Sequence, residues 1–486
     1  MKYRNLAIIS IILLAVVGIA FSNFEFKEKR YHQHLEAKVR PEDVVTTDEF
    51  ATHLPIIDIK TEAAIPPSHK ERKDENGKII KEKNYDVVKS SIKYIQNEDI
   101  ENKRGDKPVF TTNAYIRTRG NSSREFEKKG YLLKFQNENY TDNRDIEIDG
   151  MVADSDWVLN GPYLDKTLIR NYMTYNVVGE IMDYSPNVRY CEVFINDEYM
   201  GLYLLIEKIG YNKNGRVDIS KTDSKSRETS YIIKSDRPRE SESVINTLNE
   251  RIFMKTESTP EMEIIYPNKT LTEKQKDYIE KDIRTIEKVL MSSNFKDIKK
   301  GYRKYIDVDS FIDYCIINEF VSNIDANKYS MSLYKDVRGK LKRVVWDFNN
   351  AYNNYVNSNT TEVMTITTTW WYKYLMKDEY FNNKFIERYN YLRKNVLSDE
   401  YLNKYIDETI EYLGPAIERN YKRWPNVLKE DLLEDVELNN IPIKRNQHSY
   451  DEAILYLKNE IKSRGKFLDD TIGTIKYYSK NSIIGN

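Results

Sequence analysis

The sequence predicts an α+β fold with a β-rich first part and an α-rich last part. Two observations carry this prediction. Strand-like segments separated by turn residues dominate the chain up to about Glu207, whereas apolar residues at helical spacing dominate beyond residue 370. The 486 residues are 40% hydrophobic, which is enough for a substantial core. Strands followed by helices, rather than alternating with them, are typical of α+β proteins.

The N-terminal segment is predicted to target the chain to a membrane. Leu6–Phe21 is an apolar run behind Lys2 and Arg4, with a length between that of a signal-peptide core and that of a full span. We interpret residues 1–22 as an uncleaved signal anchor, and a cleaved signal peptide is the alternative. Both interpretations place the remainder outside the cytoplasm, either anchored or secreted. Residues 23–50 are polar, lack periodicity and are predicted to form a stalk.

Strand-like segments fill the first part of the chain. Residues 66–83 are charged and are interpreted as a loop or a solvated hairpin. Turn residues at 196–198 separate the last two strands and predict a hairpin. Between the strands, residues 164–184 carry apolar side chains at helical spacing and predict a helix. The expected strands are Leu54–Lys60, 113–118, Tyr131–Phe135, Val188–Ile195 and Tyr199–Glu207.

The rest of the chain is mostly helical by the same criteria. Thr272 and Gln275 form a capping-box pattern before an amphipathic stretch. Asp309 is expected to cap the apolar helix that follows it. A short hairpin is expected around Gly339, and the last helix is expected after Ser449.

Charge, cysteine and histidine content exclude several classes of function. The chain has 76 Lys and Arg against 77 Asp and Glu, which argues against a nucleic-acid partner bound by overall charge. Cys191 and Cys315 lie in apolar runs and are expected to be buried free thiols. Only five histidines are present, four of them before residue 70, so a histidine-based catalytic triad is not expected.

A loop after the strand 113–118 is a candidate anion site. Its Gly-Asn-Ser-Ser turn offers main-chain N–H groups and the Ser122 hydroxyl, and Arg119 adds a bidentate donor. Lys134 lies in the following apolar strand, where protein kinases carry the lysine that holds nucleotide phosphates. A surface loop beside a lysine that reaches solvent is the alternative interpretation.

Two aspartates are candidate catalytic groups. Asp325 follows an apolar helix and precedes a hairpin, so its carboxylate is expected at the mouth of a cleft. Asp347 directly follows the strand LKRVV and its tryptophan, where burial of a carboxylate is unfavourable unless it is paired or binds a metal ion. The alternatives are a solvated loop aspartate for the first and a turn cap for the second.

These groups follow the order that they have in a protein kinase. There, a strand lysine precedes a loop acid that orients the acceptor hydroxyl, and a later acid holds Mg²⁺. The standard GxGxxG, HRD and DFG motifs are absent, which excludes an ordinary kinase but leaves an atypical one. We therefore predict a two-lobe kinase-like domain over residues 51–420, with a β-rich N-lobe and an α-rich C-lobe. Residues 421–486 are assigned to a C-terminal helical extension.

In this order, the segments resemble the CotH kinase family. The resemblance covers about residues 54–355. It implies phosphorylation of protein Ser or Thr with ATP and Mg²⁺ or Mn²⁺, on a reduced kinase-like fold, and an association with the bacterial spore coat. The matching stretches are IRTRGNSS (116–123), YLLKF (131–135), DWVLNGPYLDKTLIRNYMTYNV (156–177), CEVFINDEYMGLYLLIEKI (191–209), VDSFIDYCIINEFVSNIDA (308–326) and VVWDFNNAY (344–352).

The resemblance implies roles for the nucleotide-binding residues. Lys134 is similar to the phosphate-binding lysine, and Arg119 and Ser122 are expected to line the phosphate site. Glu207, in YLLIEK, is similar to a recurrent family glutamate. It is expected either to pair with Lys134 or to lie near the nucleotide.

The resemblance also implies the catalytic and metal-binding residues. Asp325 is similar to the catalytic acid and Asp347 to the metal-binding acid. Asn349 stands where an acid is often found two residues after Asp347. Ser330 stands five residues after Asp325, where many members have the metal-binding asparagine. A shorter hydroxyl ligand at this position predicts weaker binding of the metal.

Three functions compete at this point. The first is an active kinase of the envelope or spore coat, whose partners are coat or envelope proteins with Ser/Thr acceptors and, through the N-terminal segment, a membrane. The second is a non-catalytic surface or coat scaffold that keeps the fold. The third is transfer from a nucleotide to a glycan or wall polymer, for which residues 370–374 (WWYKY) are a candidate sugar platform. A helix packing face is the preferred interpretation of that stretch.

Overall fold

The structure is a computed structural model of the chain. Residues 1–31, where the signal anchor is predicted, lie outside the described residues, so the anchor stays a prediction. No helix in the described part of the chain combines the length and the hydropathy that a bilayer crossing needs. The described residues are 32–45, 49–73, 79–120, 122–211, 216–237, 243–247, 260–354, 361–367, 369–433, 436–438, 441–443 and 445–480.

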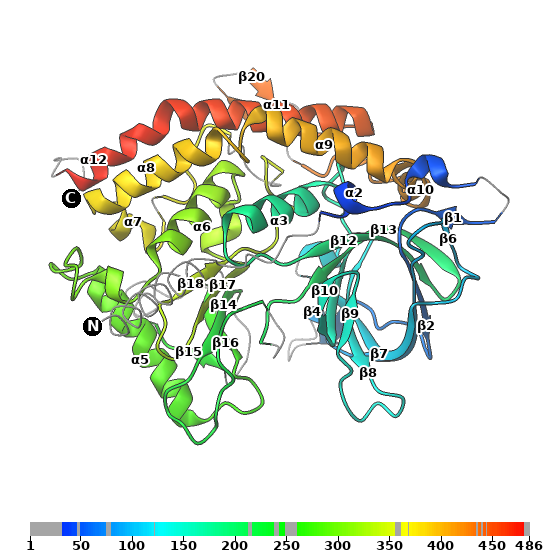
Figure 1. Ribbon diagram of the computed structural model, residues 1–486, viewed down its shortest axis with the longest axis horizontal. Helices are drawn as coiled ribbons and strands as arrows, with labels where there is room; N and C mark the ends of the chain where they lie inside the picture. The colour runs from blue at the N-terminus through cyan, green and yellow to red at the C-terminus, as the bar shows by residue number, and fades with distance from the viewer. Residues whose placement is uncertain are drawn as a thin grey trace, which may run out of the picture. The chain divides into compact units, whose positions relative to one another are not determined.

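A closed barrel forms the β-rich part of the molecule (Figure 1). Its strands run in the order β11-β13-β12-β2-β5-β7-β8, and β8 returns to β11 to close it. Neighbouring strands are antiparallel except for the parallel pair β2 and β12. The strands are β2 (Ile56–Thr61), β5 (Val88–Ile95), β7 (Phe110–Arg119), β8 (Gly130–Gln136), β11 (Asp156–Asn160), β12 (Val188–Ile195) and β13 (Glu198–Glu207).

Alternation along these strands separates two cores. Leu133, Trp157 and Leu205 belong to one apolar cluster, whereas their strand neighbours Val158 and Leu204 belong to a second and larger one. Because successive side chains on a strand point to opposite faces, one face of the barrel wall packs within the barrel and the other packs against the rest of the body.

Short strands complete the β-rich part. β3 (His69–Lys73) and β4 (Ile79–Lys83) form the hairpin that was one of the two interpretations of residues 66–83. The others are β1 (Ala51–Thr52), β6 (Asn102–Lys103), β9 (Ile146–Ile148), β10 (Met151–Asp154), β19 (Val436–Leu438) and β20 (Ile441–Ile443).

A five-stranded antiparallel sheet follows the barrel in the chain, in the order β15-β16-β14-β17-β18. Its apolar residues Ile233 and Leu333 are fully buried in the larger core. The strands are β14 (Tyr231–Asp236), β15 (Val244–Ile245), β16 (Glu261–Tyr266), β17 (Met331–Lys335) and β18 (Lys342–Val344).

Helices make up the last part of the chain, and the ribbons of α8, α9 and α11 lie together in Figure 1. Their apolar faces join α3, α5 and α6 in the larger core. The helices are α2 (Gln33–Glu36), α3 (Arg170–Ile181), α5 (Glu273–Leu290), α6 (Val308–Phe320), α7 (Tyr372–Leu375), α8 (Glu379–Arg393), α9 (Asp399–Leu413), α10 (Pro415–Arg423), α11 (Tyr450–Thr471) and α12 (Lys476–Ser479).

Helix caps largely follow the sequence. Thr272 and Gln275 form the predicted capping box at α5, and Ser449 caps α11. The prediction for α6 is wrong by two residues. Asp307, rather than Asp309, accepts the Ser310 amide, because the helix already begins at residue 308.

The α+β prediction is confirmed, with a β-rich part followed by a helical part. Part of the predicted stalk instead packs on the body, where His34 is buried and contacts Tyr172. Within the predicted extension, Leu457 and Ile461 on α11 are fully buried in the larger core. The cysteines are both free and buried, as expected.

Candidate active site

Asp347 lies three residues after β18, in a tight turn of the chain. Its backbone is left-handed, with φ of 62°. Non-glycine residues rarely adopt this conformation, and such strain is concentrated at functional sites. The carboxylate is half-buried, so a ligand can reach it while much of its hydration is removed.

Helix α3 holds the main chain of this turn. Asn171 and Tyr175 lie one helical turn apart, so their side chains share a face. The Tyr175 hydroxyl accepts the Asp347 amide at 2.9 Å, and Asn171 Oδ1 accepts the Phe348 amide at 2.8 Å. Two successive N–H groups therefore find their acceptors on one helix.

Arg170 extends this support to the end of the turn. Its Nε donates to the Ala351 carbonyl at 3.1 Å, while its Nη1 pairs with Asp165 at 2.6 Å. Both charged side chains are about 2% exposed. Removing one partner of a buried ion pair strongly destabilises a folded protein, because the other charge is left buried and unpaired. The pair with Asp165 therefore holds Arg170 in place, and Arg170 in turn holds the turn against α3.

Asn349 orients the Asp347 carboxylate. Its Nδ2 donates to Asp347 Oδ1 at 2.8 Å, and its Oδ1 accepts from Asn171 Nδ2 at 2.7 Å. Asn171 Nδ2 also lies 3.3 Å from Asn160 Oδ1, at the end of β11. Asn349 was predicted as a metal ligand, and in this arrangement its amide is engaged with Asp347 and Asn171.

Asp325 lies in the short 3₁₀ turn Ile324–Asn327, just after α6. Its Oδ2 accepts from Asn350 Nδ2 at 3.2 Å. Asn350 is only three residues after Asp347, so this contact brings the two predicted acids to neighbouring loops. The structure thus juxtaposes Asp325 and Asp347, which are separated by 22 positions in the chain.

The two acids influence each other electrostatically. Burial raises the pKa of Asp325, and the negative charge of Asp347 raises it further, while the guanidinium of Arg237 opposes the rise. Burial also raises the pKa of Asp347, against the opposing charge of Arg119 and the hydrogen bonds from Asn349. Asp236 adds a further negative charge near Asp347. A cation would relieve this concentration of negative charge.

Arg119, at the end of β7, is a positive charge close to Asp347. Its guanidinium carbon lies 5.4 Å from the centre of the Trp346 ring, next to Asp347. The loop after it turns at Gly120, whose φ is 116° and where an added Cβ would meet Ser123 Oγ. Arg124 secures the loop by donating to the carbonyls of Gly120 and Thr118. The side chain of Ser122 lies outside the described residues.

Lys134 and Glu207 do not pair with each other, contrary to one of the two expectations for Glu207. On β11, Asp156 lies opposite Lys134, whereas the next residue, Trp157, lies opposite Glu207. Neighbouring positions on a strand face opposite ways, so the register directs the two side chains to opposite faces of the wall.

Glu207 instead has its own partners. It accepts from the main chain and side chain of Asn187 and pairs with Arg216 at 3.1 Å. Lys134 is half-buried and lies opposite Tyr115, which is four positions before Arg119 on β7. Lys134 and Arg119 therefore lie on the same face of β7 and β8. Lys134 makes no side-chain ion pair within the described residues.

Ser330 immediately precedes β17 and has a left-handed backbone, with φ of 53°. It is half-buried. The register of β14 and β17 pairs Ser235 with Met331. The next pair outward would match Asp236 with Ser330, which places Ser330 at the same end of the sheet as the Asp325 loop.

Oxygen ligands rather than a carboxylate cage are available for a metal ion. No group of three or more His, Cys, Asp or Glu side chains in the described residues is arranged to hold a metal. Asn323 Oδ1, however, is buried without a hydrogen-bond partner among the described residues, while Asn323 Nδ2 donates to the Asp347 carbonyl at 3.2 Å. The neighbourhood of Asp347 therefore contains a polar oxygen whose bonding capacity is unused.

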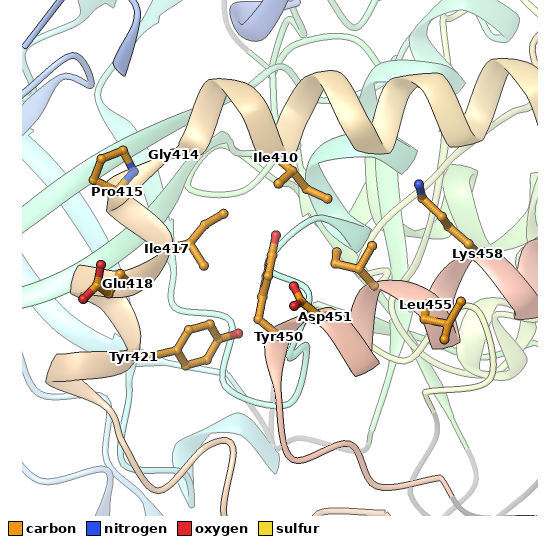
Figure 2. A pocket seen from close by; sticks show the side chains of 11 residues that line it. Ile410, Gly414, Pro415, Ile417, Glu418, Tyr421, Tyr450, Asp451, Leu455 and Lys458 are labelled. Atoms are coloured by element: carbon orange, nitrogen blue, oxygen red, sulfur yellow. The ribbon is translucent and has the colours of Figure 1, made fainter. Parts of the chain in front are cut away.

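A cavity elsewhere contains none of the predicted residues. It has a volume of about 820 Å³ and lies between α9, α10 and the start of α11, lined by Ile410, Ile417, Tyr421 and Ile454 among others. Figure 2 shows its apolar walls, with charged side chains such as Glu418 and Lys458 at the edges. The acids of the candidate active site do not line this cavity.

Residues 370–374 pack into the core rather than forming a platform. Trp371 and Tyr372 are about 2% and 0% exposed, and the Trp370 and Trp371 rings stack at 4.0 Å. This agrees with the interpretation of the stretch as a packing face.

Sequence reasoning missed the residues that support the acids. Asn171 and Tyr175 are polar groups one turn apart on a helix that is buried along most of its length, and that spacing was the available signal. Asn323 and Asn350 lie within two or three residues of the predicted acids. Arg237 is close to Asp325 only through the pairing of distant strands, which no local pattern predicts.

Two comparisons with known proteins show the family of the chain. Residues 116–468 match the family model described as CotH kinase protein. The chain is also similar to the inner spore coat protein H of Bacillus subtilis strain 168. The two are 23% identical over 376 residues, which cover 74% of this chain and 87% of that protein.

Proposed function

The chain belongs to the CotH kinase protein family, and on this premise we propose that it transfers the γ-phosphoryl group of ATP to serine or threonine hydroxyls of other proteins. The observation that carries the proposal is the juxtaposition of two half-buried acids, Asp325 and Asp347, with Arg119 close to Asp347. Phosphoryl transfer depends on positioning and charge neutralisation rather than on a protein nucleophile, and this arrangement suits those needs.

The residues around Asp347 suit a magnesium or manganese ion. Mg²⁺ commonly takes one or two carboxylates and completes its shell with waters and substrate phosphates, so a cage of three acids is not required. Asp347 would hold the ion, and Ser330 and Asn349 are the predicted further ligands. The unused oxygen of Asn323 supports an oxygen-rich site. When bound, the ion would neutralise charge on the nucleotide phosphates.

The remaining residues have complementary roles in this proposal. Asp325 orients the acceptor hydroxyl and accepts its proton as the oxygen attacks phosphorus. Its pKa, raised by burial and by Asp347, makes it a stronger base than an exposed aspartate. Arg119 and Lys134, on one face of β7 and β8, bind the nucleotide phosphates.

We extend the proposal to the spore coat, because the relative from Bacillus subtilis is named an inner spore coat protein. The acceptors would then be coat or envelope proteins. If Leu6–Phe21 is an uncleaved anchor, as predicted, the chain acts on these acceptors from a membrane. If the segment is cleaved, the chain acts on them as a secreted protein.

A non-catalytic scaffold is the second candidate function. Glu207 pairs with Arg216 rather than with Lys134. Among the described residues Lys134 therefore has no ion pair of the kind that an active protein kinase gives its lysine. A fold that has lost catalysis would tolerate this change, whereas an active enzyme needs another way to position the lysine.

The test uses the full-length chain with ATP labelled at the γ-phosphate, Mn²⁺ and dephosphorylated casein as a general acceptor. Label is expected on casein or on the chain itself. ATP with Mn²⁺ is expected to raise the Tm through binding linkage. Asp347→Asn should lose most of that rise. Asparagine is the better replacement than alanine, because it tolerates the left-handed backbone at this position.

The variant Asp325→Asn separates chemistry from binding. It should retain the rise in Tm but lose roughly 10²-fold or more in rate, the scale of a lost general base. Asp309→Asn, an exposed acid on α6, serves as the control and should behave as wild type. Absence of label with wild type, despite a normal fold, would favour the scaffold.

A further inference from the structure

The end of strand β14 lies beside the candidate active site although it is far from the two acids in sequence. β14 pairs antiparallel with β17 up to Ser235 and Met331. Ser235 Oγ also donates to the Lys328 carbonyl at 3.1 Å, inside the loop that carries Asp325. The residues that follow Ser235 are therefore held beside the loop that carries Asp325.

The next two residues carry opposite charges toward the two acids. Asp236 is among the negative charges that act on Asp347, whereas Arg237 is the first of the positive charges that act on Asp325. The Arg237 amide donates to Asp236 Oδ1 at 2.8 Å, which ties the pair together at the strand end.

Arg237 is positioned by an aromatic ring and has no ion pair among the described residues. Its guanidinium carbon lies 4.3 Å from the centre of the Tyr329 ring, and Tyr329 is 6% exposed. A guanidinium over an aromatic ring keeps its N–H donors free at the edge. Within the described residues no carboxylate forms an ion pair with it, in contrast to Arg170 and Arg388, which pair with Asp165 and Asp313.

We infer that Arg237 is a catalytic residue that binds the transferred phosphoryl group. The inference rests on the proposed function. In the reaction, the acceptor oxygen forms a bond to phosphorus, and the bond from phosphorus to the bridging oxygen breaks, so that ADP leaves with that electron pair. The hydroxyl proton passes to Asp325. Arg237 donates to the non-bridging oxygens of the group in transit, from the same side as the acceptor.

Geometry favours this role over simple recognition of ATP. Arg119, at the end of barrel strand β7, lies over Trp346 next to Asp347, whereas Arg237, at the end of sheet strand β14, lies over Tyr329 in the loop that carries Asp325. The metal-binding acid and the acid that orients the acceptor hydroxyl thus each have an arginine. A planar donor beside Asp325 meets the charge that spreads over the phosphoryl oxygens as the bond to ADP breaks.

The test compares Arg237→Ala, Arg237→Lys and the control Arg338→Ala in the full-length chain. Arg338 is exposed in the turn after β17, at the end of that strand that lies away from the Asp325 loop. Arg237→Ala should lose about 10²- to 10³-fold in kcat, the scale of one removed charge-stabilising donor. Its Kd for ADP with Mn²⁺ should stay within about 3-fold of wild type. Arg237→Lys, which keeps the charge without the planar fork, should be intermediate.

A second measurement does not depend on turnover. Aluminium fluoride bound with ADP and Mn²⁺ imitates the phosphoryl group in transit and should bind wild type and Arg338→Ala more tightly than ADP alone. Arg237→Ala should lose this gain.

If Arg237→Ala keeps the gain and its kcat, or if only the KM for casein rises, Arg237 is not catalytic. If wild type itself neither binds ATP nor transfers phosphate, the proposed function fails first and this inference fails with it. Should Arg237→Ala not fold, Arg237→Lys decides by the same criteria.

Discussion

The left-handed backbone of Ser330 bears directly on the metal affinity of the proposed site. Asparagine tolerates a φ of 53° better than serine does, and its amide oxygen reaches about one bond further. Ser330→Asn is therefore expected to fold normally and to bind the metal about 10-fold more tightly, the scale of changes in the residues that support metal ligands. The measurement is the Mn²⁺ concentration for half-maximal phosphoryl transfer. Lower activity at every Mn²⁺ concentration would show that Ser330 does not face the metal.

Glu207 is expected to matter for stability more than for nucleotide binding. It is 8% exposed and joins Asn187 to Arg216. Glu207→Gln removes the charge that Arg216 needs, and the free energy of unfolding should fall by about 1–3 kcal/mol. Chemical denaturation measures this change, and titration with ATP and Mn²⁺ should give a Kd within about 3-fold of wild type.

The variant Lys134→Ala provides the opposite signature. It should weaken ATP binding and leave the unfolding free energy almost unchanged, because Lys134 makes no side-chain ion pair in the described part of the chain. A large loss of ATP affinity in Glu207→Gln would instead show that Glu207 contributes to the nucleotide site.

At the scale of residues, the sequence predicted the acids but not their surroundings. Asp325 and Asp347 stand out because Asp325 lies between an apolar helix and a hairpin and Asp347 follows an apolar strand. The partner of Glu207 could not be predicted, since it depends on which face of β13 the last residue of the strand occupies. A one-residue difference in register reverses that face.

Helix α3 is the element that holds the Asp347 turn, and its tyrosine offers a sharp test. Tyr175→Phe removes only the hydroxyl that accepts the Asp347 amide. A buried N–H without an acceptor costs about 1–3 kcal/mol, so we expect a loss of stability of this size together with weaker binding of ATP and Mn²⁺. Denaturation and calorimetric titration measure the two effects.

Tyr172→Phe is the matched control on the same helix. Its hydroxyl contacts His34, away from the Asp347 turn. A similar loss of stability without a loss of nucleotide affinity is expected. Equal effects of both variants on affinity would mean that α3 acts through general stability rather than by holding the turn.

At the scale of elements, local sequence patterns predicted a hairpin and two helix caps correctly. The hairpin of β12 and β13, the capping box of α5 and the cap of α11 all follow the sequence closely. The role of the buried polar residues on α3 was not predicted, because their one-turn spacing does not identify the groups that they bind. Only their partners in the Asp347 turn explain them.

Three histidines join the N-terminal segment to the helical part, and two of them, His34 and His53, make stability depend on pH. The His34 ring lies 4.5 Å from Tyr405 and the His53 ring 5.1 Å from Tyr412, and both tyrosines lie on α9. His32 stacks on His34 and contacts Glu180 on α3. Burial, with smaller contributions from neighbouring positive charges, lowers the pKa of His34 to about 3 and that of His53 to about 4.

The sign of the pH dependence follows from these values. Below pH 6.5 the unfolded chain takes up protons at these histidines, whereas the folded chain does not until pH 4 or 3. Stability is therefore present above pH 6.5 and is lost as the pH falls, by about 2 kcal/mol for each histidine between pH 7 and 5. The double variant His34→Gln and His53→Gln should flatten the dependence of unfolding free energy on pH over this range. The exposed His448→Gln should leave it unchanged, and an equal slope in all three proteins would contradict the assignment.

At the scale of the whole molecule, the sequence predicted the class but not the topology. Closure of the barrel depends on the parallel pairing of β2 with β12, whose residues are more than 130 positions apart. The five-stranded sheet likewise joins β14 to β17 across α5 and α6. Such pairings depend on long-range packing, so periodicity within a segment does not contain them.

Closure of the barrel also determines which fragments of the chain stay soluble when they are produced on their own. A fragment that begins at residue 116, where the family match starts, lacks β2, β5 and most of β7. It would leave β12 and β8 with unpaired N–H and C=O groups along one side. Unprotected edges of this kind recruit strands from other molecules. Such a fragment is expected to aggregate, so chain boundaries chosen for solubility should lie before Ile56.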